Sequence, residues 1–178
     1  YLCKEIIIEI AKIVVKHDMW LISDEAYRSL SYTDETGSSI WALNENDVQG
    51  IIGRRISIES ASKVWNACGL RIGGLLTDNK ELHDKAISEY TANLCANALG
   101  QDIFGAMAKE PHPKIREWQN MQKNYYRSML MELKTEFQSH IPGIIVTVPE
   151  AAIYFIIDFI NITDINFHTV DFIDFCAT

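Results

Sequence analysis

The first 25 residues change their hydrophobic pattern once, and this change limits the folds open to the chain. Residues 4–17 place apolar side chains at helical spacing between charged ones, which predicts an amphipathic helix. The apolar positions of that helix are Ile6, Ile10, Ile13 and Val14. The apolar run 19–22 follows, is typical of a buried strand, and ends at Ser23-Asp24-Glu25. Because a helix that leads directly into a buried strand is half of an α/β unit, an α/β fold is predicted.

Further elements are indicated by period and by turn residues along the chain. Strands are predicted at 54–58, 72–77, 144–148 and 153–159. Helices are predicted at 79–97 and 114–140, with a break at Pro111 and Pro113, and 33–39 is a loop by composition. We place a change of domain across the long helix. The expected regions are 1–110 as part of a large α/β domain, 111–140 as an interdomain helix, and 141–178 as the start of a small α+β domain.

Composition and charge exclude several classes of protein. The 178 residues are 48% hydrophobic, which is typical of a packed globule rather than of a disordered chain. The net charge is −8 and the basic residues form no stripe, so no nucleic-acid partner is expected. No apolar run reaches the roughly 20 residues that a membrane span requires, so no membrane association is expected. The histidines are scattered and no cluster has zinc-ligand spacing, so no metal site is predicted.

The four cysteines and the two ends of the chain concern its cellular context. The cysteines are Cys3, Cys68, Cys95 and Cys176. They could form two disulfides in a secreted protein, but irregular spacing and the lack of a signal peptide favour buried free thiols and a cytoplasmic protein. The chain opens on Tyr1 without a methionine and closes within a predicted helix, so we expect an internal fragment of a longer protein.

One segment, Ser60-Ala61-Ser62-Lys63 through Gly73, carries the strongest chemical signal. A lysine follows a predicted strand in a serine-rich turn, and Arg71 lies eight residues further on. Serine hydroxyls and a guanidinium group can bind an anion such as phosphate, and glycines allow the backbone to approach closely. The Lys63 amine could form an imine with a carbonyl cofactor. A surface loop with an ordinary lysine and arginine could have the same spacing, so the residues alone leave both interpretations open.

The pattern Ser-x-Ser-Lys-x5-Gly-x-Arg-x-Gly resembles the cofactor-attachment signature of class I/II aminotransferases. The resemblance implies that pyridoxal 5'-phosphate is the cofactor and that Lys63 holds it as an internal aldimine. It further implies that Ser60 and Arg71 bind the cofactor phosphate. Ser62 matches the pattern and is also a candidate cofactor-binding residue.

A second segment, Ser23-Asp24-Glu25-Ala26-Tyr27, resembles the strand-end sequence "SDExY" of the same family. The resemblance implies that Asp24 pairs with the pyridine nitrogen of the cofactor, and that the Tyr27 hydroxyl contacts its phenolic oxygen. Taken by themselves these residues could equally be a capping acid and a half-buried tyrosine. Further along the chain, 149–154 resembles the family's "PxGxFY" turn, with Ala151-Ala152 in place of the usual glycine-containing step.

The resemblance implies a fold and an activity for the parent protein. The fold is part of the large pyridoxal-phosphate-transferase domain, with a mixed, mostly parallel sheet and helices, plus the start of a small α+β domain. The activity is transamination between an amino acid, with aspartate as the candidate, and a 2-oxo acid, in a homodimer of the full-length protein. The segment alone is expected to be inactive, because partners of the site lie outside it and its incomplete sheet would expose apolar faces.

Two other functions stay open at this point. A β-elimination C–S lyase of the same fold is one, although such relatives often carry histidine at the position of Tyr27. A non-catalytic fragment or an aminotransferase-like regulator module is the other. Trp118, Tyr125 and Tyr126 on the long predicted helix are expected to pack between domains rather than to contact the cofactor.

Overall fold

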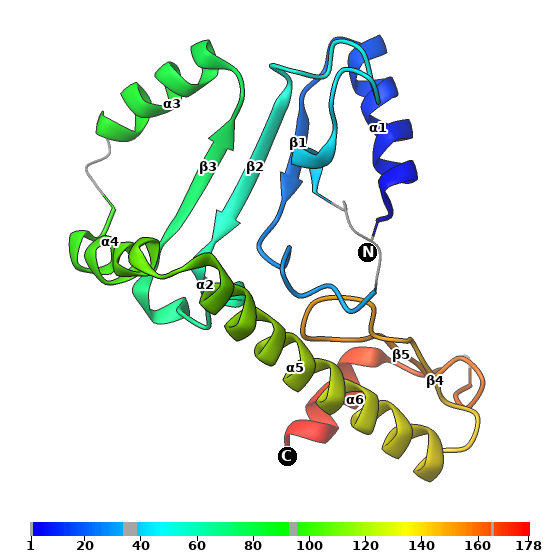
Figure 1. Cartoon of the computed structure of the whole chain (residues 1–178). Coiled ribbons are helices and arrows are strands. Elements are labelled where there is room, and N and C mark those ends of the chain that lie inside the picture. The colour runs from blue at the N-terminus through cyan, green and yellow to red at the C-terminus, as the bar shows by residue number, and fades with distance from the viewer. Residues whose placement is uncertain (1, 34–38, 93–95, 165) are drawn as a thin grey trace.

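A three-stranded sheet lies at one end of a long helix, and a two-stranded sheet lies beside the other end (Figure 1). This computed structural model describes residues 2–33, 39–92, 96–164 and 166–178. The strands are β1 (Leu21–Asp24), β2 (Arg55–Ser60), β3 (Gly73–Thr77), β4 (Ile145–Val146) and β5 (Ile157–Asp158). The α-helices are α1 (Lys4–Lys16), α2 (Ala61–Val64), α3 (Lys80–Ala92), α4 (Ala98–Gly105), α5 (His112–His140) and α6 (Thr169–Ala177). Three short 3-10 helices are η1 (Ile40–Ala42), η2 (Cys68–Leu70) and η3 (Ala106–Lys109).

The larger sheet has the order β1-β2-β3 and is mixed, as predicted. Strands β1 and β2 are parallel, with Asp24 beside Ile58. Strands β2 and β3 are antiparallel, with Ser60 beside Gly73. Because β1 and β2 point the same way, their carboxyl ends at Asp24 and Ser60 lie at one edge of the sheet (Figure 1). The three strands predicted for this part of the chain are therefore confirmed, with β2 two residues longer at its end than expected.

Helix α1 packs a narrow stripe of side chains against β1 and the segment that follows it. The buried stripe is Ile7, Ala11 and Val14, and its partners are Leu21, Ile40, Leu43, Val48 and Ile51. The predicted helix is confirmed, but of the apolar positions named from its spacing only Val14 is buried, and Ile6, Ile10 and Ile13 are between 37 and 55% exposed. The helix carries apolar residues on two faces, and the position of its neighbours decides which face is covered.

The opposite face of the sheet exposes apolar side chains. Ile58 pairs with Leu75 across the sheet, and Ile22 lies on the same face of β1 as Asp24. Ile22, Ile58 and Leu75 are 64, 41 and 48% exposed. The predicted buried strand at 19–22 is thus covered on one side only. The exposed apolar faces expected for the segment alone are confirmed at these positions.

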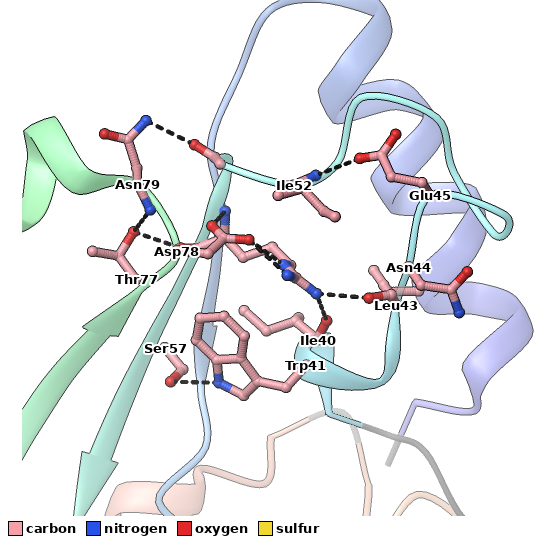
Figure 2. A network of polar contacts seen from close by, with 12 residues as sticks. Ile40, Trp41, Leu43, Asn44, Glu45, Ile52, Ser57, Thr77, Asp78 and Asn79 are labelled. Atoms are coloured by element: carbon pink, nitrogen blue, oxygen red, sulfur yellow. Dashed lines mark hydrogen bonds and ion pairs between the residues drawn. The ribbon is translucent and has the colours of Figure 1, made fainter.

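A largely buried ion pair joins the start of β2 to the turn after β3 (Figure 2). Asp78 Oδ2 accepts a hydrogen bond from Arg55 Nε at 2.7 Å and lies 2.6 Å from Nη2 of the same guanidinium. Arg55 Nη1 donates to the carbonyl oxygen of Leu43 at 2.6 Å, and the guanidinium lies 5.0 Å from the Trp41 ring centroid. Trp41 in turn donates its indole N–H to Ser57 Oγ at 3.0 Å. This network fixes the η1 segment and β3 to the strand that leads to Lys63.

The predicted helix at 79–97 is wrong in its second part. Helix α3 ends at Ala92, and residues 93–95 lie outside the described part of the chain. Asn97 is the N-cap of α4, and its side-chain oxygen accepts a hydrogen bond from the Gly100 N–H at 3.2 Å. Asparagine favours helix caps over helix interiors because its short amide competes for backbone donors. This capping geometry starts α4 directly after the predicted helix end at Asn97, and α4 itself was not predicted from the sequence.

The long helix is confirmed and begins at His112, two residues before the predicted start. Pro113 lies in its first turn, where the missing N–H has no helical partner to lose. Strands β4 and β5 pair antiparallel and are shorter than the predicted 144–148 and 153–159. The proposed domain limits at 110 and 140 remain predictions.

Segments 30–32 and 150–152 meet although they are about 120 residues apart in sequence. The N–H of Ala152 donates to the Leu30 carbonyl at 2.9 Å, and the N–H of Tyr32 donates to the Glu150 carbonyl at 2.7 Å. Ala152 has a left-handed backbone with φ of 64°. Its segment is the one that replaces the family's glycine-containing step, so alanine here takes a conformation that glycine adopts more readily.

The cysteines differ in part from expectation. Cys3, Cys68 and Cys176 are free, but Cys68 and Cys176 are exposed rather than buried, and Cys95 lies outside the described residues. No helix within the described ranges is both long and apolar enough to cross a membrane. In the same residues, no group of three or more histidine, cysteine or acidic side chains has the geometry of a metal site.

Candidate functional site

The lysine turn, defined as residues 60–71, begins where β2 ends. Ser60 is the N-cap of the short helix α2, and its Oγ accepts a hydrogen bond from the Ser62 N–H at 3.0 Å. A serine hydroxyl that accepts through one lone pair keeps its O–H free to donate, so the cap leaves Ser60 able to bind an anion. Lys63 lies on α2 and is exposed. Among the described residues, no hydrogen bond or ion pair is found for the Lys63 amine.

Arg71 closes the lysine turn in a left-handed conformation, with φ of 52°. Its Nη1 donates to the Cys68 carbonyl at 3.0 Å, which uses one of its five N–H donors. Gly73 follows as the first residue of β3, and a Cβ there would lie 2.8 Å from the Glu59 carbonyl oxygen. The glycine at this motif position is therefore required by the close approach of β3 to β2. By contrast, a Cβ at Gly69 would meet nothing within 4 Å.

Asp24 and Tyr27 lie just beyond the neighbouring strand. Asp24 is exposed at the end of β1, and its Oδ1 accepts a hydrogen bond from the Ala26 N–H at 3.0 Å. Its second carboxylate oxygen has no hydrogen-bond partner among the described residues. The Tyr27 ring makes an edge contact with Tyr154, with 5.7 Å between centroids and 85° between planes. The segment at 149–154 that resembles a family motif therefore contacts the segment that bears Asp24.

Two neighbouring cavities open at this edge of the sheet. One, of about 390 Å³, is lined by Asp24, Tyr27 and Tyr154 among others. The other, of about 380 Å³, is lined by Ser60, Trp65 and Phe104 among others. Glu25 and Arg28 border both. The structure thus brings Asp24 and Tyr27 into one cavity and Ser60 into the next, whereas Ser62, Lys63 and Arg71 line neither.

The wall between the two cavities is a charged cluster that the sequence did not indicate. Buried Glu25 accepts hydrogen bonds at Oε1 from Ser39 Oγ at 2.9 Å and from the Ile40 N–H at 3.0 Å. Its Oε2 lies 3.5 Å from Arg28 Nη1, and Arg28 Nη2 donates to Glu59 at 3.2 Å. The glutamate of "SDExY" therefore anchors the loop after β1. No local spacing reveals the bonds from Ser39 and Ile40, because these residues lie 14 and 15 positions from Glu25.

Aromatic contacts attach the lysine turn to helices α4 and α5. Trp65 stacks on Trp118 of α5, with 5.5 Å between centroids and 9° between planes, and makes an edge contact with Phe104 of α4. The Tyr126 hydroxyl donates to Asn66 Oδ1 at 3.0 Å. Trp118 and Tyr126 were expected to pack between domains, and both contact the lysine turn. The only local signal for this was the presence of aromatic residues on the long helix.

The lysine turn carries donor groups that suit a phosphorylated carbonyl cofactor. An exposed amine, a free serine O–H and a largely unengaged guanidinium lie within one turn, and these groups bind phosphate and carbonyl carbon. The Asp24 carboxylate lies at the end of the adjacent strand, and its Oδ2 has no hydrogen-bond partner within the described ranges. The residues present are therefore chemically compatible with pyridoxal phosphate.

Comparison with known proteins supports the same assignment. A sequence model of the family described as aminotransferase class I and II matches residues 2–170. The chain is 27% identical over 151 residues to a probable aspartate/prephenate aminotransferase of Aquifex aeolicus. This alignment covers 85% of the chain and 36% of that protein. It is 27% identical over 154 residues to an aspartate aminotransferase of Musicola paradisiaca, with 86% and 36% covered. The chain thus spans about a third of the length of these relatives.

Solved structures resemble the fold. A pyridoxal-phosphate-bound putative aminotransferase from Clostridium difficile superposes with a TM-score of 0.77 at 16% identity, over 89% of this chain and 39% of that one. At this identity the likeness concerns the fold, and it confirms the fold type expected from the resemblance. Together with the family match over residues 2–170, it leads to one conclusion: the chain belongs to the class I and II aminotransferase family.

Proposed function

We propose that the protein containing this chain transfers an amino group between an amino acid and a 2-oxo acid, with pyridoxal phosphate held by Lys63. One observation carries the proposal. Asp24 and Ser60 end two adjacent parallel strands at the same edge of the sheet, and Lys63 follows Ser60 in an exposed turn. Open α/β sheets bind ligands at this edge, beyond the carboxyl ends of their strands.

Each candidate residue has a role that its chemistry supports. When bound, pyridoxal phosphate supplies an aldehyde that condenses with a lysine amine, with loss of one water, and a ring that withdraws electrons from the substrate. Lys63 would hold the cofactor and then move the substrate Cα proton. Asp24 would keep the ring nitrogen protonated, and Tyr27 would donate to the phenolic oxygen. Ser60, Ser62 and Arg71 would bind the phosphate.

The test is the identity of the modified lysine. The full-length protein is loaded with pyridoxal phosphate, reduced with borohydride and digested, and the labelled peptide is identified by mass spectrometry. We expect the label on Lys63, and loss of the visible cofactor absorbance in Lys63→Ala. Lys80→Ala is the control, because Lys80 is an exposed lysine whose amine pairs with Asp84 on the next turn of α3. A visible band and a reduced lysine adduct that persist in Lys63→Ala would refute the assignment.

Substrate and assembly are finer parts of the proposal. The names of two relatives include aspartate, so aspartate with 2-oxoglutarate is the first substrate pair to assay. Pyruvate and ammonia released from cystathionine without any transfer would instead indicate a β-elimination lyase. We further propose that the full-length protein is a cytoplasmic homodimer, which size-exclusion chromatography with light scattering and cell fractionation would test.

A further inference from the structure

The lysine turn is attached to α5 at two separate points. Trp65 stacks on Trp118, and Asn66 accepts a hydrogen bond from Tyr126. Trp118 and Tyr126 are eight residues apart on α5, which corresponds to about 12 Å along the helix axis. Two attachments at this separation restrain rotation of the turn as well as its distance from the helix.

The second attachment holds a residue in an uncommon backbone conformation. Asn66, three residues after Lys63, has φ of 50°. Non-glycine residues occupy this left-handed region only when surrounding contacts favour it, although asparagine tolerates it better than most. The Tyr126 hydroxyl supplies such a contact by donating to the Asn66 side chain at 3.0 Å. The course of the chain just after Lys63 therefore depends on a residue 60 positions away.

Tyr126 also lies near the segment that follows Tyr27. Tyr32 is buried, and its hydroxyl donates to the carbonyl oxygen of Ala152. Burial raises the pKa of Tyr32 to about 12, and the nearby phenol of Tyr126 adds to that rise.

We infer that Tyr126 is a positioning residue for Lys63, because its hydroxyl holds Asn66, and with it the lysine turn, against α5. This inference rests on the proposed function, in which Lys63 holds the cofactor. Tyr126 is not placed in contact with the cofactor. Tyr126 instead affects the orientation of Lys63, the lysine that holds the cofactor.

The experiment compares Tyr126→Phe with Tyr125→Phe in the full-length protein. Tyr125 is the adjacent tyrosine, is 64% exposed, and makes an edge contact with Tyr126 that phenylalanine preserves. We measure the dissociation constant of pyridoxal phosphate by absorbance titration, the visible circular dichroism per bound cofactor, and the melting temperature without cofactor. We expect Tyr126→Phe to raise the dissociation constant roughly fivefold, the factor that one net hydrogen bond supplies, and to change the dichroism. Tyr125→Phe should leave both unchanged.

A second variant tests the pathway through Asn66. Asn66→Gly keeps the left-handed backbone accessible and removes the acceptor. If the hydroxyl acts through Asn66, Tyr126→Phe has no further effect in the Asn66→Gly background. Two results would overturn the inference: equal dichroism and cofactor affinity in Tyr126→Phe and Tyr125→Phe, or fully additive effects in the double variant. In either case borohydride would still label Lys63, and the proposed function would stand. A label on another lysine refutes the proposed function itself, and the positioning role with it.

Discussion

The Arg55–Asp78 ion pair offers the sharpest test of how β2 is held in place. Asp78→Asn keeps the size of the side chain and removes the charge that Arg55 faces. In the native structure the carboxylate accepts from Arg55 Nε at 2.7 Å and from the Arg55 backbone N–H at 3.3 Å. The two side chains are only 10 and 17% exposed, so water replaces little of what is lost.

The expected cost follows from the charge that is left behind. Removing one partner of a buried pair costs about 3–5 kcal/mol, because the other charge stays uncompensated. Arg55 retains its hydrogen bond to the Leu43 carbonyl and its contact with the Trp41 ring, which soften the loss. We therefore expect the lower end, about 3 kcal/mol. With a urea dependence of about 1–3 kcal/mol per molar, the unfolding midpoint should fall by roughly 1 to 3 M.

The control is the same substitution in an exposed pair. Asp84 lies 2.6 Å from Lys80, and the two side chains are 56 and 86% exposed. Solvent screens such pairs, so Asp84→Asn should hardly move the midpoint. Urea denaturation of both variants in the full-length protein, followed by fluorescence, gives the comparison. Equal midpoints for Asp78→Asn and Asp84→Asn would refute the argument that burial makes the first pair important.

The pH dependence gives a second check on Asp78. Burial by itself raises the pKa of this carboxyl, but hydrogen bonds from the Gly53 backbone and from Arg55 outweigh it, and the net pKa is lowered. A lowered pKa in the folded state contributes stability above the unfolded pKa and loses it as pH falls through the folded value. The difference in the free energy of unfolding between wild type and Asp78→Asn should therefore become smaller as the pH is lowered. A gap that stays constant down to the folded pKa would contradict the charge-based explanation.

Three further predictions follow from burial and close approach. Gly73→Ala should destabilise the protein by about 1–3 kcal/mol, because the added Cβ would lie 2.8 Å from a backbone oxygen. Gly69→Ala is the control and should leave the stability unchanged, because a Cβ there meets nothing within 4 Å. Chemical denaturation measures both variants. Because burial raises the pKa of Tyr32 to about 12, its stabilising contribution is complete below the unfolded value near 10 and is lost between about pH 10 and 12. The free energy of unfolding of the wild type should thus fall by about 2 kcal/mol relative to that of Tyr32→Phe by pH 11.5. Unfolding free energies of the two proteins that change in parallel with pH would contradict this prediction. Leu30→Ala, at a side chain with 0% exposure, should cost about 2–5 kcal/mol, while Leu99→Ala, at 77% exposure, should cost little in the same assay.

The elements that the sequence predicted well are those with a strong local signal. The long helix has Pro113 in its first turn and a sustained period, and it was placed to within two residues at its start. The strand that leads to Ser60 was found because 55–58 alternate polar and apolar residues and a serine-rich turn follows them. The predicted helix at 79–97 is longer than α3, which ends at Ala92, and α4, which Asn97 caps, was not predicted.

The candidate site divides in the same way. The motif from Ser60 to Arg71 and the pair Asp24 and Tyr27 could be named from local sequence, and the resemblance gave them roles that remain to be tested. Their position at one sheet edge follows once β1 and β2 are known to be parallel. The two cavities could not be predicted, because each wall comes from several segments.

The sequence by itself determined the order of the longer elements, the family and the residues able to bind a phosphorylated carbonyl cofactor, because these depend on local period and on motif. Tertiary structure alone decided that Ile7 rather than Ile6 is buried on α1, and that Tyr126 reaches Asn66. Burial and polar pairing depend on what a distant segment presents, and a helix with two apolar faces does not specify which one will be covered.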